Sequence, residues 1–248
     1  MNLFRVRGIQ LAVHFSFFLL LAVNAFIGWA DSGQSGLFWH TAALLAFFTC
    51  VVLHELGHSF IAMRYGIGVR RILLMPIGGM AEFDSIPRQP VRELWITLAG
   101  PAVNFVIAAA LWVVLPSHVE TGSDAMTVLD FGHLLLQWNL LMGCFNLLPA
   151  FPMDGGRILR AGLATRLNYV RATFWAVTVG KVFCVVGMGF AAFYEPMLLL
   201  LFGFILFVGE MEYRAVKRRE IEDAHLRAML ARQYAFDPSV EEPPLLMR

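Results

Sequence analysis

Apolar residues occupy long, nearly unbroken runs of this sequence, and short polar segments separate the runs. A helix needs about 20 mostly apolar residues to cross a bilayer. Five runs reach this length, near residues 8–30, 37–63, 94–115, 131–152 and 172–193. A sixth and shorter run covers residues 196–212. The pattern therefore predicts an all-α integral membrane fold of six transmembrane helices.

One further apolar segment, residues 70–84, does not fit a helix. Pro76, Gly78 and Gly79 interrupt it, and proline removes a backbone donor that a helix needs. We therefore expect this segment to form either a short membrane-associated β-hairpin between the second and third helices or an ordinary apolar loop packed against the helices.

The composition agrees with a membrane protein, since 58% of the 248 residues are hydrophobic, 15% are charged, and the mean hydropathy is +0.67. Lys and Arg are absent from the segments near 31–36, 116–130 and 194–195, and they collect in the alternate segments and the tail. Because cytoplasmic loops carry the excess of Lys and Arg, both termini are expected in the cytoplasm. The net charge of +1 provides no basic field, so we expect no nucleic-acid partner.

The chain divides into an expected six-helix transmembrane core, residues 1–212, and an expected cytoplasmic C-terminal helix and tail, residues 213–248. The second segment carries charges of both signs, which is typical of a solvated helix face. Lys181 falls near the middle of the fifth run, where an unpaired charge is costly. The sequence indicates no partner for it.

The candidate chemistry lies in the second run, which reads HELGH at residues 54–58. On a helix, His54 and His58 lie about 40° apart around the axis and about 6 Å apart along it, so both imidazoles can bind one metal ion. Glu55 stands beside them as a general base for a water whose pKa zinc lowers. The alternative is a hydrogen-bonded polar cluster, but ionisable residues within a span are costly and usually functional.

A catalytic zinc usually takes three protein ligands. The carboxylates expected at the matching depth are Asp154, Glu210 and Glu212. Asp154 lies in NLLPAFPMDGGR at residues 146–157, where two prolines and two glycines predict unwound backbone. Unwound backbone at membrane depth is tolerated only where it lines a cavity or is buried, and this favours Asp154. A plain helix-ending turn would also explain the prolines and glycines.

Three motifs together resemble the site-2 protease family of intramembrane zinc metalloproteases. They are HELGH at residues 54–58, AGPAVNF at residues 99–105 and NLLPAFPMDGGR at residues 146–157. The similarity covers residues 8–212. Many relatives add a CBS pair or a PDZ domain, but only about three dozen residues follow residue 212, too few for a CBS pair. We therefore expect the family core without a CBS or PDZ module.

The resemblance implies roles for individual residues. His54, His58 and Asp154 would hold one Zn²⁺ per chain, and Glu55 would activate the water. Asn146 matches a family asparagine that helps to stabilise the developing oxyanion or to position the substrate.

The resemblance also implies a substrate class. The enzyme would cut single-span membrane proteins in or near their transmembrane segment, in regulated intramembrane proteolysis. Its lipid bilayer would be the bacterial cytoplasmic membrane, with the active site near the cytoplasmic side. A helical substrate must unwind and present an extended strand, and the Gly78–Gly79 hairpin could offer an edge to that strand. Oligomeric state is left open.

Two other classes of function remain open from the sequence. A metal or cation transporter would also bury histidines, but it needs polar groups leading to both sides, whereas ionisable residues here cluster on the cytoplasmic side. An inactive scaffold relative would not need Glu55 beside two metal ligands. His14 could line the cavity or be a structural histidine, and Cys50 is assigned to packing.

Overall fold

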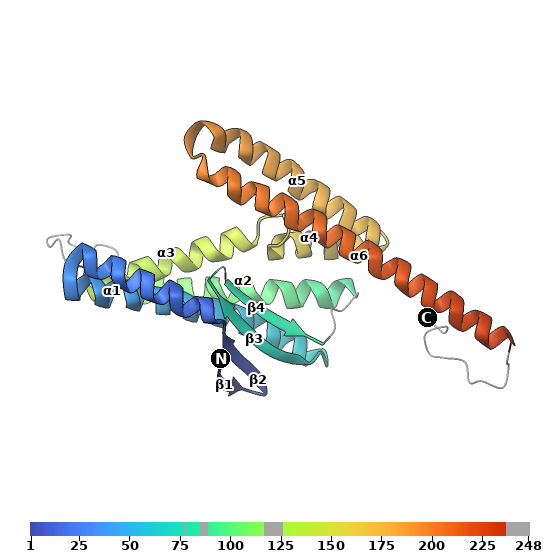
Figure 1. Ribbon diagram of the computed structural model, residues 1–248, viewed down its shortest axis with the longest axis horizontal. Helices are drawn as coiled ribbons and strands as arrows, with labels where there is room; N and C mark the ends of the chain where they lie inside the picture. Colours follow the sequence, from blue (N-terminus) through green and yellow to red (C-terminus); the bar gives the residue numbers. More distant parts are fainter. Residues whose placement is uncertain (77, 85–88, 117–125, 237–248) are drawn as a thin grey trace.

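The computed structural model describes residues 1–76, 78–84, 89–116 and 126–236. Figure 1 shows a mostly helical chain with a small four-stranded sheet beside the helices. The helices are α1 (Phe15–Arg64), α2 (Pro90–Val114), α3 (Val128–Asn146), α4 (Asp154–Ala164), α5 (Tyr169–Tyr194) and α6 (Met197–Phe236). Four of them, α1, α2, α3 and α5, are long and apolar enough to cross a membrane.

Helix α1 is a 50-residue element that folds back on itself. Ser32 (φ −138°) and Gly33 (φ 60°) leave the helical conformation, and glycine adopts a positive φ without steric cost. The two halves then approach closely, because a Cβ atom on Gly28 would lie 2.5 Å from the carbonyl oxygen of Gly36. The first two apolar runs thus fall in the two halves of α1, with a sharp break between them.

The N-terminal residues form strands, so the prediction that a first span begins at residue 8 is wrong. Arg7 (φ 47°) and Gly8 (φ 92°) make a tight two-residue turn between β1 (Asn2–Val6) and β2 (Ile9–Val13). Strand β2 pairs in parallel with β3, and helix α1 begins only at Phe15. An apolar run that continues from strand into helix hides this boundary.

Strands β3 (Val69–Met75) and β4 (Gly78–Phe83) pair antiparallel, and the sheet order is β1-β2-β3-β4. The fold is mostly helical, as predicted, but the sheet has four strands where the prediction of an all-α fold allowed one short hairpin. The sheet packs on the second half of α1, where Leu56 joins Ile9, Leu11 and Ile72 in one buried cluster. This packing places the sheet beside the HELGH segment.

Helix α3 ends at Asn146, earlier than the expected boundary at residue 152. Residues 147–153 lie outside any helix, as the prolines at 149 and 152 predict. The chain becomes helical again at Asp154, which is the first residue of α4. The sequence did not predict α4 as a separate helix, yet α4 contacts both α2 and α5.

Helix α6 runs without a break across the boundary expected at residue 212. It packs along α5, and there Lys181 finds the partner that the sequence did not indicate: its Nζ atom donates to Oε2 of Glu210 at 2.7 Å. In Figure 1 the α5–α6 pair stands apart from α1, α2 and α3, and α4 connects the two groups. Of the expected loops and tail, residues 117–125 and 237–248 lie outside the described residues.

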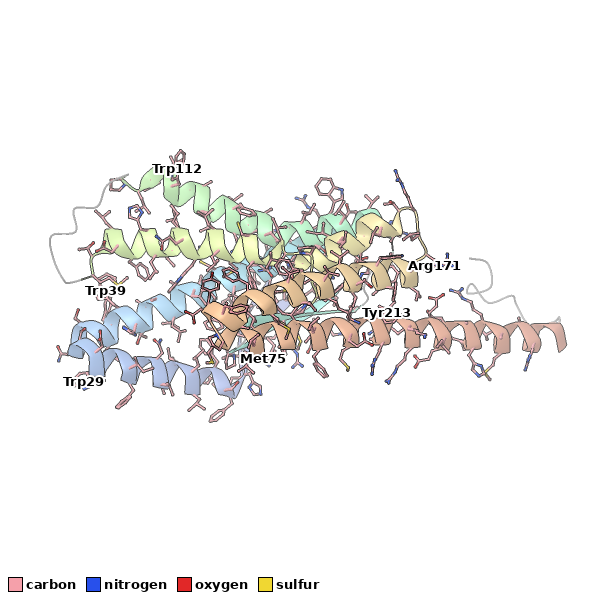
Figure 2. The ribbon with its side chains drawn as sticks, turned by 90° about the horizontal axis from the view of Figure 1, so that it is seen from above. Trp29, Trp39, Met75, Trp112, Arg171 and Tyr213 are labelled. Atoms are coloured by element: carbon pink, nitrogen blue, oxygen red, sulfur yellow. The ribbon has the colours of Figure 1, made fainter. Side chains whose placement is uncertain are left out.

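Figure 2 labels residues at both ends of the molecule. Figure 2 places Trp29, Trp39 and Trp112 at one end and Arg171 at the other. Tryptophan is enriched where a membrane protein meets the interface between lipid and water. The end with Trp29, Trp39 and Trp112 is called the tryptophan end. It is the end at which α1 folds back and α2 finishes.

Candidate metal centre

Three side chains from two distant parts of the chain meet beside the sheet. The Oδ2 atom of Asp154 lies 3.2 Å from Nε2 of His54 and 3.2 Å from Nε2 of His58. The two Nε2 atoms are 3.1 Å apart. All three residues are buried, with exposed fractions of 4 to 7%. Helix α1 supplies both histidines at the expected i, i+4 spacing, and the first residue of α4 supplies the carboxylate.

The second ring nitrogen of each histidine is engaged by α2. Nδ1 of His58 donates to the backbone carbonyl of Ile96 at 2.8 Å. Nδ1 of His54 donates to Oδ1 of Asn104 at 2.6 Å. A neutral imidazole has one N–H, so a donating Nδ1 leaves Nε2 with a lone pair. Both lone pairs then face Asp154.

This donor set fits a zinc ion. When both rings are neutral, two imidazole lone pairs and a carboxylate oxygen converge here, and the buried Oδ2 of Asp154 has no hydrogen-bond partner among the described residues. Such an arrangement is unfavourable without a cation. In a tetrahedral zinc site with bonds of about 2.0 Å, neighbouring ligand atoms lie about 3.3 Å apart. The separations of 3.1 to 3.2 Å match that value.

Two glycines allow α1 and α2 to meet at this point. A Cβ atom on Gly57 would stand 2.7 Å from the carbonyl oxygen of Ala99 and 2.8 Å from Cγ2 of Val103. A Cβ atom on Gly100 would collide with the Nε2 atoms of both His54 and His58. Helices α1 and α2 therefore approach closely at Gly57 and Gly100, and the sequence did not predict the contact of Gly100 with the histidines.

A cavity of about 680 Å³ opens beside the three side chains. Its walls come from α1, β4, α3, the segment 147–153, α4 and α6. Glu55 lines it next to the histidines. Asn146 and Arg157 also line it, and Nδ2 of Asn146 donates to the backbone carbonyl of Met142 at 3.0 Å. A carboxylate, an amide and a guanidinium thus face the same space as the candidate ligands.

The two competing carboxylates are engaged elsewhere. Glu210 bonds Lys181 at 2.7 Å and Arg214 at 2.8 Å, and Glu212 accepts from Arg160 at 2.6 Å. Neither belongs to the cluster formed by the histidines and Asp154. His14, the other residue considered for the cavity, caps the start of α1 through Ser16 and is exposed.

Sequence reasoning missed a buried ion-pair cluster near this site. Arg160 of α4 is 1% exposed and donates to Glu93 of α2 through both Nε (2.9 Å) and Nη2 (2.5 Å). Its Nη1 atom donates to Glu212 of α6. The guanidinium also lies over the rings of Phe151 and Tyr169. No local sequence pattern pairs an arginine with a glutamate so far away along the chain. The sequence therefore gave no indication of this cluster.

Comparisons with known proteins place the chain in a family. The family model described as Peptidase family M50 matches residues 42–126 and 117–187. A zinc metalloprotease of Methanocaldococcus jannaschii is 40% identical over 217 residues, which cover 87% of this chain and 61% of that protein. Stage IV sporulation protein FB of Bacillus subtilis is 25% identical over 90% of this chain and 75% of its own length.

A solved structure agrees with these matches. The site-2 protease from Methanocaldococcus jannaschii superimposes with a TM-score of 0.61 at 36% sequence identity, covering 86% of this chain and 94% of that one. The chain spans about half to three fifths of the length of several curated relatives that it matches. With its four apolar helices, the chain belongs to peptidase family M50, the site-2 protease family of zinc metalloproteases, and is an integral membrane protein.

Proposed function

We propose that this protein is a zinc-dependent endoprotease that hydrolyses peptide bonds in or near the transmembrane segment of single-span membrane proteins. One observation carries the proposal: the lone pairs of His54 and His58 and the Oδ2 atom of Asp154 converge within 3.2 Å at the wall of a cavity that also contains Glu55. These are the ligands and the base that metal-assisted hydrolysis requires.

The residues of the cavity have separate tasks in this proposal. His54, His58 and Asp154 hold the zinc, which lowers the pKa of water and polarises the scissile carbonyl when bound. Glu55 takes a proton from the attacking water and then donates it to the leaving amine. Asn146 turns its amide from its own helix toward the substrate and donates to the developing oxyanion.

Strand β4 is the proposed docking edge for the substrate. It is the last strand of the sheet, and its residues Gly79, Met80, Ala81 and Phe83 line the cavity. An edge strand presents free backbone donors and acceptors, to which an unwound substrate can add as a further strand. Pairing at β4 would hold a peptide bond beside Glu55, with the hairpin at the membrane boundary.

The proposed topology counts the two halves of α1 as two spans and gives six in all. The termini then lie in the cytoplasm with Arg171, and the tryptophan end lies outside. The metal centre lies toward the cytoplasmic side, because His58 is close to the end of α1 at Arg64. Residues 1–212 form the core, residues 213–248 form the cytoplasmic segment, and the membrane is the bacterial cytoplasmic membrane. Cleavage would belong to regulated intramembrane proteolysis.

The test compares the wild-type chain with Glu55→Gln, both purified in detergent. Zinc is measured by elemental analysis, and cleavage is measured on a panel of single-span membrane proteins. We expect about one zinc per chain in both proteins and cleavage only by the wild type. Glu195→Gln is the matched control, since Glu195 is an exposed carboxylate at the end of α5, and it should cleave normally.

Two outcomes would reject the proposal. A wild-type protein that binds no zinc, or a Glu55→Gln variant that cleaves at the wild-type rate, would remove the metal-assisted mechanism. Zinc flux through wild-type protein in liposomes, together with no cleavage, would instead support a transporter. The two assays therefore separate the enzyme from the main alternative.

A further inference from the structure

We propose that Asn104 and Asn139 are positioning residues for the candidate zinc ligand His54. A chain of directed hydrogen bonds runs from a backbone carbonyl in α3 through both amides to His54, and it holds that imidazole in the tautomer that can bind metal. This inference rests on the proposed zinc site, and it assigns a task to two residues that would touch neither metal nor substrate.

The chain of hydrogen bonds crosses three helices. Nδ2 of Asn139 in α3 donates to the carbonyl of Leu135 at 2.8 Å. Nδ2 of Asn104 in α2 donates to Oδ1 of Asn139 at 3.0 Å, and Nδ1 of His54 in α1 donates to Oδ1 of Asn104 at 2.6 Å. Both asparagines have exposed fractions of 0%. Buried amides of this kind must satisfy their polar atoms inside the protein.

The carbonyl of Leu135 fixes the direction of every bond. A carbonyl oxygen can only accept, so the NH₂ group of Asn139 must face Leu135, and its Oδ1 then faces Asn104. The NH₂ group of Asn104 must face that oxygen, which turns Oδ1 of Asn104 toward His54. Reversing either amide would place two donors or two acceptors against each other and leave buried polar groups without a hydrogen bond, which is unfavourable.

The last acceptor in the chain selects the histidine tautomer. Because Oδ1 of Asn104 cannot donate, the proton of the neutral His54 ring must lie on Nδ1, and Nε2 keeps its lone pair. A ligand histidine commonly has its other nitrogen bonded to an acceptor in this way. For His58 a backbone carbonyl has that task directly, whereas for His54 two side chains carry it from α3.

Asn139 also contacts α1 directly, the helix that carries His54. Nδ2 of Asn139 also lies 3.3 Å from Sγ of Cys50, one turn before His54 on α1. Three transmembrane helices are thus joined at the depth of the metal centre.

The test measures zinc affinity of the full chain by competition with a chelator, and it measures thermal unfolding of the metal-free protein separately. Asn104→Leu removes the acceptor at similar volume, and we expect about 10- to 100-fold weaker zinc binding. Asn104→Asp keeps an acceptor for Nδ1, and we expect at least about tenfold tighter zinc binding than in Asn104→Leu. Asn139→Leu removes the acceptor that orients the Asn104 amide, together with the contact to Cys50, but it leaves Asn104 in place. The zinc affinity of this variant should therefore lie between those of the wild type and Asn104→Leu.

Thr97→Val provides the matched control. Thr97 lies on α2 and is 0% exposed like Asn104, but its Oγ1 atom has no hydrogen-bond partner among the described residues. This variant should bind zinc as the wild type does. A change in unfolding temperature alone would report packing, whereas a loss of zinc affinity reports the orientation of His54.

The outcomes separate this inference from the proposed function. Wild-type zinc affinity in Asn104→Leu would overturn the inference and leave the protease proposal intact. So would equally weak binding in Asn104→Leu and Asn104→Asp, because the acceptor would then not matter. If Asn104→Leu does not fold, wild-type affinity in Asn139→Leu overturns the inference instead. A wild-type chain without zinc would reject both proposals.

Discussion

Gly79 of strand β4 lies directly against Glu55 of helix α1. A Cβ atom on Gly79 would stand 2.8 Å from Cγ of Glu55 and 3.1 Å from Cγ1 of Val51. Contacts this short force a neighbouring side chain to move. The hydrogen of glycine thus lets the edge strand and the proposed general base share the wall of one cavity, and the position of each depends on the other.

Substitutions at Gly79 should therefore reduce turnover without removing zinc. Gly79→Ala pushes Glu55 aside, and misplacing a catalytic group by about 1 Å can cost on the order of 100-fold. Gly79→Pro adds the same Cβ atom and also removes a backbone N–H. A lower cleavage rate in Gly79→Pro than in Gly79→Ala would therefore indicate that the backbone edge of β4 takes part in cleavage. Cleavage rate and bound zinc are measured for both variants. Gly189→Ala, where a Cβ atom meets nothing within 4 Å, is the control.

Full cleavage by Gly79→Pro would remove the docking role of β4. Equal losses in the alanine and proline variants would assign the effect to Glu55 alone. Loss of zinc in either variant would contradict the separation between the edge strand and the metal ligands.

Gly100 makes a different prediction, since its substitution should weaken zinc binding itself. A methyl group on Gly100 would collide with the Nε2 atoms of His54 and His58, so Gly100→Ala must displace at least one of them. We expect at least about tenfold weaker zinc binding, as seen when the support of a metal ligand is disturbed. Chelator competition measures it. Gly162→Ala on α4 adds a methyl group in open space, and an equal loss there would refute this explanation.

The choice of Asp154 among three carboxylates can be tested in the same assay. Asp154→Asn removes the charged oxygen that faces both histidines, so zinc affinity should fall by more than the roughly 100-fold typical of losing an outer partner. Glu210→Gln changes a carboxylate that bonds Lys181 and should leave zinc affinity unchanged. If instead Glu210→Gln loses zinc and Asp154→Asn keeps it, the assignment is reversed.

Features that depend on local sequence could be predicted. The i, i+4 spacing of His54 and His58 follows from helix geometry, and the prolines at 149 and 152 indicated the unwound segment before Asp154. Strand β2 could not be predicted, because Ile9–Val13 is as apolar as the helix that follows and its partner β3 lies far along the chain. Sequence patterns show which residues are apolar, but tertiary pairing decides which element they join.

Polar partners between helices were equally hidden. Lys181 had no visible partner until α6 was placed along α5 with Glu210 beside it. Asn104 stood within a quoted motif without a role, although a buried amide on an apolar helix is a signal in its own right. A role can be assigned to such residues only when the helix that packs against them is known.

Arg160 should be the most important charged residue for stability. It joins α4 to Glu93 of α2 and Glu212 of α6, and both Arg160 and Glu93 are 1% exposed. Removing one partner of a buried pair leaves the other charge without compensation, which typically costs about 3–5 kcal/mol. Because α4 begins with Asp154, loosening α4 should also weaken the proposed zinc site.

Arg160→Met should thus unfold in detergent at a markedly lower temperature than the wild type, whereas Arg171→Met, which alters an exposed arginine at the start of α5, should change little. The double variant Arg160→Met with Glu93→Leu should recover much of the loss, because two apolar side chains can replace a buried ion pair at little cost. Thermal unfolding of the wild type, Arg160→Met, Glu93→Leu and the double variant gives the coupling energy between Arg160 and Glu93. If the loss in the double variant equals the sum of the two single losses, Arg160 and Glu93 are not coupled, and the uncompensated charge of Glu93 does not explain the instability of Arg160→Met.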